Sequence, residues 1–114
     1  MLNLARKITL FKKKEILDLF KSSKFLVKNP NFDLKRAPSS QDFGRILIII
    51  PKKVGSAPLR NRLRRRVKAI FYENQMFELP YDLVIFFKPG SGNLSFQELK
   101  DILNMGILNS DLRP

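Results

Sequence analysis

The chain has no cysteine, no histidine and no tryptophan among its 114 residues, and only 10 residues are acidic. The absence of cysteine removes disulfide bridges and thiolate metal sites, which suits a reducing cytoplasm. Without histidine and cysteine, the chain lacks the usual general base and the usual thiol nucleophile. A transition-metal site would need carboxylates alone, and the sequence shows no tight cluster of them. We therefore expect neither a catalytic residue nor a metal ligand in this chain.

Targeting and membrane-spanning segments are missing as well. The first residues contain no apolar core followed by a cleavage site, so no signal peptide is predicted. The longest apolar run, residues 46–51, is far too short to cross a bilayer. These features predict a soluble, cytoplasmic protein without a membrane partner.

Positive charge is what the chain has in excess. Lysine and arginine number 22 against 10 acidic residues, which gives a formal net charge of +12. Because 44% of the residues are hydrophobic, the composition is that of a folded protein, and the length suits one domain over residues 1–114. Its ends, residues 1–9 and 109–114, are expected to be loosely ordered. Such an imbalance of charge favours nucleic acid or an anionic membrane surface as partner.

Hydrophobic periodicity and turn residues predict the element order αβββαβα. The predicted helices cover residues 10–21, residues 58 to about 74 or 75, and a segment from 96 onwards; the predicted strands cover residues 25–27, 31–35, 45–50 and 82–87. The apolar, largely β-branched run at 45–50 is typical of a central strand buried on both faces. Residues 36–44 are expected to form a loop. The strand–helix–strand order predicts a crossover and a parallel pair within a mixed sheet, so the fold class is α+β, an α/β sandwich.

Two helix starts are marked by capping residues. Ser56 precedes Pro58, which suits the first turn of a helix because its missing N–H is not needed there. Ser95 and Glu98 have the spacing of a capping box. We expect both serines to accept a hydrogen bond from the first turn of the helix that follows.

Residues 60–68 carry the densest positive charge, since seven of the nine side chains are arginine, lysine or asparagine. The apolar side chains of this predicted helix are Leu59, Leu63, Val67, Ile70 and Phe71. At about 100° per residue they fall within an arc of roughly 120°, which must dock on the sheet. Only Glu73 could neutralise the other face within the helix, so intrahelical ion pairs do not explain the arginines. A solvated surface is the simpler interpretation, but arginines facing phosphates make paired hydrogen bonds and release counterions, which favours nucleic acid.

Two lysines in the loop before this helix extend the candidate surface. Lys52 and Lys53 would lie beside the free N–H groups of a helix N-terminus, a combination that binds phosphate. The loop lacks the spacing of a nucleotide P-loop, so ATP binding is not predicted. The complete set of predicted nucleic-acid contacts is Lys52, Lys53, Arg60, Asn61, Arg62, Arg64, Arg65, Arg66 and Lys68.

The first predicted helix and the phenylalanines offer weaker signals. Residues 12–14 are three lysines on the side away from the apolar arc, where exposed lysines are often only solvated. The chain has 10 phenylalanines, and by default these are core residues. We expect Phe86 and Phe87 in the core. For Phe20 and Phe32, a core position and a groove in which unpaired bases stack both remain open.

The order and spacing of these motifs resemble the bacterial ribonuclease P protein family. In that family a strand leads into a Lys-Lys-Val-Gly loop and a helix that opens with Arg-Asn-Arg-x-Lys-Arg, which correspond here to residues 52–55 and 60–65. A basic N-terminal segment and a short helix precede them. Three further segments follow: Leu-Val-Ile-Phe-Phe87, Lys-Pro-Gly90 and Leu-Ser-Phe-x-Glu-Leu99. The resemblance covers most of the chain.

The resemblance implies a fold like the second domain of ribosomal protein S5, with a left-handed βαβ crossover against the usual right-handed rule. It implies that the chain is the protein subunit of ribonuclease P, an endoribonuclease whose catalytic centre lies in the partner RNA. That holoenzyme removes the 5′ leader of precursor tRNA to give the mature tRNA 5′ end, and Mg²⁺ held mainly by the RNA activates the water. No small-molecule substrate is implied.

The resemblance also assigns roles to residues. The motif residues at 52–53 and 60–65 would contact the catalytic RNA. The precursor-tRNA leader would lie in a cleft between the first helix and the sheet. The residues expected in contact with the leader are Lys12, Lys13, Phe20 and Phe32.

Three other functions remain alternatives from the residues alone. A ribosomal or assembly protein that binds structured RNA fits the charge and the mixed α/β domain equally well, and only the combined Lys-Lys-Val-Gly and Arg-Asn-Arg motifs separate it. A DNA-binding regulator would need base-reading side chains among neutral ones, whereas residues 60–68 are almost wholly cationic. An intrinsic nuclease would need catalytic groups that the chain lacks.

Overall fold

The computed structural model describes residues 4–111, with side chains described for residue 4 and residues 6–106. Its sheet has the strand order β1-β2-β4-β3. The strands are β1 (Lys24–Lys28), β2 (Phe32–Pro38), β3 (Ile46–Ile49) and β4 (Tyr81–Phe87). The α-helices are α1 (Leu4–Lys7), α2 (Lys13–Ser22), α3 (Ala57–Glu73) and α4 (Phe96–Asp111). Short 3₁₀ turns are η1 (Lys52–Val54), η2 (Met76–Glu78) and η3 (Ser91–Asn93).

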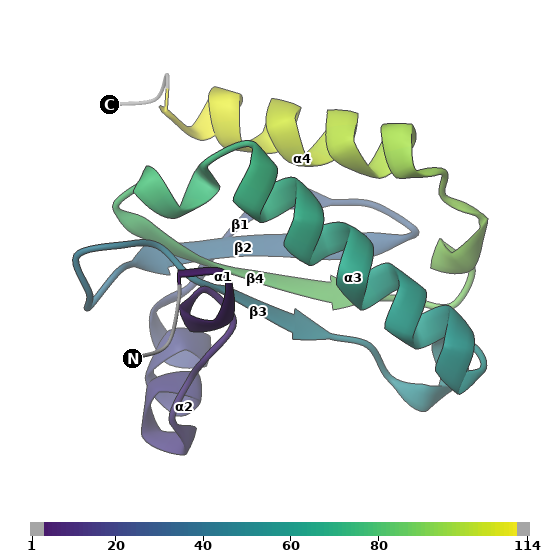
Figure 1. The fold of residues 1–114 in the computed structure, drawn as a ribbon, viewed down its shortest axis with the longest axis horizontal. Helices are drawn as coiled ribbons and strands as arrows, with labels where there is room; N and C mark the ends of the chain where they lie inside the picture. Colours follow the sequence, from purple (N-terminus) through teal and green to yellow (C-terminus); the bar gives the residue numbers. More distant parts are fainter. Residues whose placement is uncertain (1–3, 112–114) are drawn as a thin grey trace.

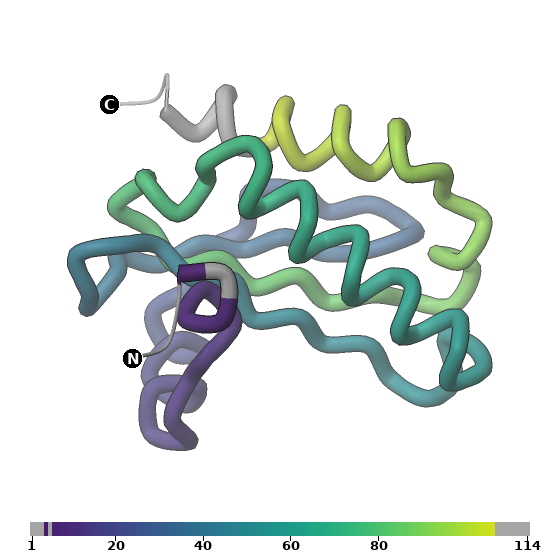
Figure 2. Tube along the Cα trace, in the orientation of Figure 1, coloured from purple at the N-terminus to yellow at the C-terminus, as the bar shows by residue number. Residues whose placement is uncertain are grey.

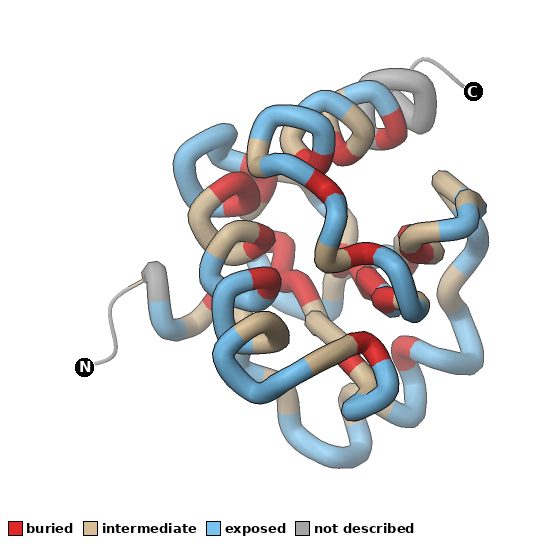
Figure 3. The backbone as a smooth tube through the Cα atoms, turned by 90° about the vertical axis from the view of Figure 1, so that its right-hand side faces the viewer, coloured by how far each residue is buried: buried red, intermediate tan, exposed pale blue. Residues whose placement is uncertain are grey.

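One face of the sheet is covered by α3 and α4. These helices lie side by side across the strands, and buried positions gather on the sides of the helices that face the sheet (Figures 1 and 3). The core between helices and sheet includes Phe32, Leu34, Ile85, Phe87 and Val67, all fully buried. This layer is the sandwich that the sequence predicts.

The other face of the sheet is covered only in part. Figure 2 shows α2 on the side of the trace away from α3 and α4. Leu19 of α2 packs against Ala37 of β2 and Val84 of β4, and these three side chains form a second, smaller cluster. The rest of this face borders a groove, which is described below.

The crossover β3–α3–β4 has the predicted topology. β3 pairs with β4 in parallel, whereas β2 pairs with β4 antiparallel, so the sheet is mixed. In Figure 1 both β3 and β4 point to the right, α3 returns in front of the sheet and β4 lies above β3. That arrangement is a left-handed crossover, opposite to the hand of nearly all βαβ units.

The prediction that residues 45–50 form a central strand is wrong. β3 lies at the edge of the sheet, and β2 and β4 are the central strands. Both faces of β3 are nonetheless packed. Ile46 and Ile48 belong to the main core, while Leu47 and Ile49 contact the cluster under α2. Residues 46–49 are apolar because both faces of β3 are covered, although β3 has a neighbouring strand on one side only.

The boundaries of the first elements also differ from the prediction. β2 continues through Pro38 because residues 36–38 pair with residues 81–83 of β4, so the expected loop is shorter at its start. The first long helix begins at Lys13, three residues later than predicted, and α1 was not predicted. Periodicity alone gave no signal for a helix of four residues.

Both predicted helix caps are confirmed. The Ser56 Oγ accepts the Leu59 N–H at 3.3 Å at the start of α3. At the start of α4, the Ser95 Oγ accepts the Glu98 N–H at 3.1 Å, and the Glu98 carboxylate accepts the Ser95 N–H at 3.4 Å. These bonds set where the two long helices begin.

The predicted loose order of residues 1–9 and 109–114 falls partly outside the described residues, which exclude 1–3 and 112–114. Within them, Ile8 is fully buried in the main core. Its carbonyl accepts the Ile46 N–H at 2.7 Å. This contact attaches the N-terminal segment to the start of β3.

A buried arginine joins α2 to the sheet. The Nη2 of Arg45 lies 2.9 Å from Glu15 Oε2 of α2 and 3.3 Å from Asp82 Oδ2 of β4. The Nη1 of Arg45 donates to the Leu10 carbonyl at 3.0 Å, and the guanidinium lies 4.2 Å from the Phe11 ring centre. Arg45 and Asp82 are each only 4% exposed, so these charges are paired out of water. We call Arg45, Glu15 and Asp82 the Arg45 cluster.

Replacing Arg45 by methionine is expected to destabilise the fold by about 3–5 kcal/mol, because it leaves the buried Asp82 carboxylate without its ion pair. Urea unfolding at pH 7 measures the loss. Arg65→Met is the matched control, since the same change at an exposed position should stay within about 0.5 kcal/mol. Equal stability of the two variants would contradict the structural role of the Arg45 cluster.

The stability of the protein is expected to fall in acid through Glu15. The hydrogen bond from Arg45, with a second from the Lys12 backbone N–H, holds the pKa of Glu15 below its ordinary value of 4.5. A lowered pKa stabilises the fold at pH values above the ordinary pKa, and this contribution disappears as the pH falls through the lowered value. Unfolding free energies measured from pH 7 to pH 3 should therefore decrease more steeply for the wild type than for Glu15→Gln. Parallel profiles would contradict this.

Candidate nucleic-acid interface

The outer face of α3 carries the arginines because the inner face is buried against the sheet. Leu63, Val67 and Ile70 are buried, which confirms the docking face predicted from the helical period. The predicted contacts that reach solvent on the opposite side are Asn61, Arg62, Arg64 and Arg65.

The arginines of α3 differ in what they bind within the protein. The Nε of Arg60 donates to the Gly55 carbonyl at 3.2 Å, and the Nη1 of Arg64 donates to the Asn61 side-chain oxygen at 3.0 Å. Arg62 and Arg65 have no hydrogen bond or ion pair with any residue in the part of the chain that the structure describes. Their guanidinium groups are available for an external partner.

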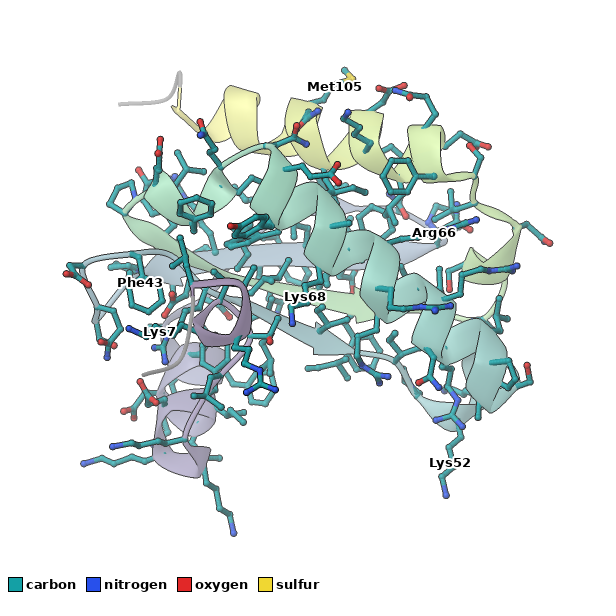
Figure 4. The ribbon with its side chains drawn as sticks, viewed as in Figure 1. Lys7, Phe43, Lys52, Arg66, Lys68 and Met105 are labelled. Atoms are coloured by element: carbon teal, nitrogen blue, oxygen red, sulfur yellow. The ribbon has the colours of Figure 1, made fainter. Side chains whose placement is uncertain are left out.

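Arg66 and Lys68 lie on the two flanks of the helix. Figure 4 shows Arg66 on the side toward α4, where its Nη1 donates to the Leu94 carbonyl at 3.3 Å, and Lys68 on the other side. Both side chains are partly buried. These residues therefore border the exposed arginine face and do not form its centre.

The two predicted loop lysines lie beside the start of α3. Lys52 and Lys53 belong to η1 and are exposed, and Figure 4 shows Lys52 extending away from the body of the protein. A hollow of about 390 Å³ opens at this end of α3. It is lined by Ser56, Pro58, Leu59, Arg62 and Arg65. Positive charge, a helix N-terminus and a concave surface thus occur together here.

A groove lies on the opposite face of the sheet, beside α2. It has a volume of about 250 Å³, and we call it the sheet groove. Its lining residues are Phe20, Phe25, Asp33, Lys35, Ile49, Val84 and Phe86. Phe20, Phe25 and Phe86 are 47%, 52% and 40% exposed, which is unusual for aromatic residues in one cluster. The place, between the first long helix and the sheet, is the one that the resemblance implies for a cleft.

Two predictions about phenylalanines are wrong. Phe32, expected at the leader cleft, is fully buried in the main core, where its ring centre lies 5.8 Å from that of Phe87. Phe86, expected in the core, lines the sheet groove. Both errors have one cause, since successive residues of a strand point to opposite faces and only one face of this sheet is fully covered.

Phe25, Asp33 and Lys35 are groove residues that the sequence reasoning missed. The alternation along β2 contains the signal for two of them, because Asp33 and Lys35 must face away from the side buried by Phe32 and Leu34. For Phe25 there is no such signal. The register of β1 shifts between Phe25 and Val27, and this irregularity alters which face each residue takes.

Lys12 and Lys13 are exposed at the start of α2 but do not line the sheet groove. Lys12 borders a different hollow, of about 420 Å³. The other residues that line it are Lys7, Leu10, Phe11, Glu15, Gln41, Phe43 and Arg45. Figure 4 shows Lys7 and Phe43 on this side of the molecule, away from Lys52.

Within residues 4–111, the side chains described include no group of three or more carboxylates placed to hold a metal ion. In the same part of the chain, no helix has both the length and the apolar character needed to cross a bilayer.

Comparison with known proteins decides between the alternatives left by the sequence. The family model of ribonuclease P matches residues 4–109. The chain belongs to the ribonuclease P protein family. As a member, it is a protein component of the ribonuclease P holoenzyme, which contains an RNA partner and acts in tRNA 5′ maturation. This membership favours ribonuclease P over a ribosomal protein or a DNA-binding regulator.

Relatives in other bacteria support the same assignment. The ribonuclease P protein component of Ureaplasma parvum is 32% identical over 114 residues and aligns with 96% of this chain and 100% of its own length. The component from Petrotoga mobilis is 37% identical over 82 residues, which is 65% of this chain and 69% of that protein. The component from Lactococcus lactis is 30% identical over 89 residues, 78% of this chain and 76% of that protein.

Solved structures share the fold. The ribonuclease P protein of Thermotoga maritima, solved with a fluorophenyl thiourea, has a TM-score of 0.72 at 25% identity over 84% of this chain and 94% of that chain. A Staphylococcus aureus ribonuclease P protein, a mutant with defective mRNA degradation activity, has a TM-score of 0.81 over 95% of this chain and 92% of that chain. Its identity of 18% makes it a likeness of fold alone.

The different burial of Phe20 and Phe32 predicts losses of stability of different size for the same substitution. Phe32→Ala removes a fully buried ring and is expected to cost about 3–5 kcal/mol of stability. Phe20→Ala removes a half-exposed ring and should cost about 1 kcal/mol or less. Chemical unfolding of both variants measures the difference, and a Phe20→Ala loss as large as that of Phe32→Ala would place Phe20 in the core.

Proposed function

We propose that this protein subunit binds the catalytic RNA of ribonuclease P through the outer face of α3 and the 5′ leader of precursor tRNA through the sheet groove. In doing so it assists the Mg²⁺-dependent endonucleolytic removal of the leader, in the cytoplasm. The observation that carries the proposal is the exposure of Arg62 and Arg65 without a partner in the described part of the protein.

The charge on the outer face of α3 favours a polyanion opposite it. Arg62 and Arg65 are three residues apart, so their side chains are neighbours on the helix surface and repel each other. RNA phosphates remove this repulsion and accept paired hydrogen bonds from each guanidinium. Lys52, Lys53 and the hollow at the start of α3 extend the same surface, which suits an RNA backbone passing the end of the helix.

The sheet groove suits a single strand better than a duplex. Its exposed rings of Phe20 and Phe86 offer flat surfaces on which unpaired bases stack, whereas the ammonium groups of Lys35 and Lys28 lie over the Phe25 ring, 4.4 and 5.2 Å from its centre. A base-paired helix keeps its bases stacked on each other and cannot use such rings. The leader is the single-stranded part of precursor tRNA that the proposal places there.

The segment between β3 and α3 connects the two surfaces along the chain. Ile49 lines the sheet groove, and Lys52 and Lys53 follow it by three and four residues, in the turn that leads to α3. Substrate in the groove and catalytic RNA on α3 would therefore approach each other beside these two lysines. Their ammonium groups reduce the repulsion between the phosphates of the two RNAs. The Mg²⁺ ions that activate the attacking water would be held mainly by the RNA.

Arg62→Ala and Arg65→Ala are each expected to weaken binding to ribonuclease P RNA by about 1–3 kcal/mol while the fold stays intact, and to lower the salt dependence of binding by about one counterion. Lys100→Ala on α4 is a control with the same loss of charge and should bind nearly as the wild type. Filter binding over a series of salt concentrations and thermal unfolding measure the two effects. A large loss of thermal stability with unchanged RNA binding would contradict the assignment.

The function itself is tested by precursor-tRNA cleavage at low Mg²⁺ with bacterial ribonuclease P RNA. Cleavage at the mature 5′ end should require both the RNA and this protein at that Mg²⁺ concentration. A lack of stimulation by the protein would contradict the proposed role. Cleavage by the protein without RNA would place an active site in this chain, against the absence of histidine and cysteine.

A further inference from the structure

All ten residues of helix α2 are described, and only Leu19 among them is buried. Leu19 packs against Ala37 and Val84 of the sheet. Leu17 and Phe20, on either side of it in the chain, are 53% and 47% exposed. A helix of this length is marginal by itself and depends on tertiary contacts. The position of α2 is therefore sensitive to each contact that it makes with the rest of the protein.

The ion pair between Glu15 and Arg45 is the second attachment of α2. Glu15 lies one turn before Leu19, and its Oε2 is 2.9 Å from Arg45 Nη2. Arg45 is itself held independently of α2, because Asp82 Oδ2 pairs with it at 3.3 Å and the Leu10 carbonyl accepts a hydrogen bond from its Nη1 at 3.0 Å. A helix held at one point can turn about that point, whereas two points one turn apart fix its direction and its rotation. The ion pair therefore orients the helix.

The orientation of α2 determines one wall of the sheet groove. Phe20 is the residue that α2 contributes to the lining, and the other lining residues belong to the strands. Phe20 follows Leu19 directly, so the two side chains point about 100° apart around the helix axis. A rotation of α2 about the Leu19 contact would move the Phe20 ring toward the strands or away from them. The width of the groove thus depends on Glu15, which is not among the lining residues.

We propose that Glu15 is a positioning residue for leader binding, because its ion pair with Arg45 holds Phe20 where this ring forms a wall of the sheet groove. The inference rests on the proposed function, since the leader is the molecule that occupies the groove there. Glu15 acts through the helix and does not touch the leader. As a negative charge it repels RNA phosphates, so the loss of its charge alone would strengthen RNA binding. Weaker leader binding on its replacement would therefore report the lost orientation and not the lost charge.

Glu15 can be replaced while the buried centre of the Arg45 cluster stays paired. Asp82 still accepts the Arg45 backbone N–H at Oδ1 and pairs with the guanidinium at Oδ2. The Glu15 side chain is 24% exposed, so water reaches the place of its carboxylate. A glutamine has one acceptor oxygen where the carboxylate has two, so it cannot accept from the Lys12 N–H and from Arg45 together. Glu15→Gln is therefore expected to stay folded, with α2 less firmly attached.

The leader contribution is measured as the ratio of the affinities of the holoenzyme for precursor tRNA and for mature tRNA, with Ca²⁺ in place of Mg²⁺ to prevent cleavage. Glu15→Gln is expected to lower this ratio by at least about fivefold, the value of one lost stacking contact, while mature tRNA binds as before. Glu15→Asp keeps the charge on a shorter side chain and should give an intermediate ratio. Asp18→Asn is the matched control, because it removes the same charge from an exposed position of α2 that has no ion pair within the described residues. It should not lower the ratio.

Two further measurements separate positioning from general destabilisation. In a Phe20→Ala background, Glu15→Gln should change the ratio little, because the ring through which Glu15 acts is gone. Hydrogen exchange of the free protein should be faster in the α2 amides of Glu15→Gln than in those of the wild type, with the α3 amides unchanged. Thermal unfolding checks that each variant is folded at the temperature of the binding measurement.

The outcomes distinguish this inference from the proposed function. A wild-type ratio of about one would contradict leader binding, and the inference with it. A large wild-type ratio that folded Glu15→Gln and Glu15→Asp both retain would overturn the inference and leave leader binding standing. An equal loss in Asp18→Asn would assign the effect to charge, and an equal loss with and without the Phe20 ring would show that Glu15 does not act through Phe20. If Glu15→Gln does not fold, Glu15→Asp decides the question by itself.

Discussion

The Arg45 cluster is the interaction on which the functional surfaces of this protein depend. Glu15 both caps the start of α2 and attaches this helix to the sheet. One of its carboxylate oxygens accepts the Lys12 N–H at 2.8 Å, and the other pairs with Arg45. The same guanidinium pairs with Asp82, whose Oδ1 also accepts the Arg45 backbone N–H at 2.9 Å. The start of α2, the start of β3 and the start of β4 are thereby joined. Because buried charges tolerate little displacement from their partners, α2 is held at one end of the sheet, and the sheet groove stays open beside it.

Arginine has two distinct roles in this chain, and burial separates them. Arg45 is enclosed and paired with carboxylates, and Arg60 and Arg66 donate to backbone carbonyls, so these three side chains stabilise the fold. Arg62 and Arg65 point outward from α3 and add to the self-repulsion of a chain with a net charge of +12. Their charge has no stabilising role within the described part of the protein. The charge of these arginines becomes stabilising when a polyanion binds. The excess of positive charge in the chain is therefore explained by its place in a ribonucleoprotein.

The difference between the two faces of the sheet accounts for what the sequence reasoning missed. Phe86 and Phe87 are adjacent in a strand, so one of them must face away from α3 and α4. Placing both in the core assumed that the strand was covered equally on both sides. Phe32 was assigned to the groove although Asp33, its neighbour, is the residue that faces it. Alternation shows that such neighbours face opposite sides, but it does not show which side is covered by helices.

The sequence by itself determined the local features of this protein: the caps at Ser56 and Ser95, the buried arc of α3, the parallel crossover and the exposed arginines. The caps and the two faces of α3 depend on residues close together in the chain or on the period of a single element, and the crossover follows from the order strand–helix–strand. Only the tertiary structure decided that β3 lies at an edge, that Phe86 and not Phe32 lines the groove, and that Asp33 lies beside it. These features depend on which helix packs on which face of the sheet. That choice is made by contacts between distant residues, such as Arg45 with Glu15 and Asp82, which no local pattern encodes.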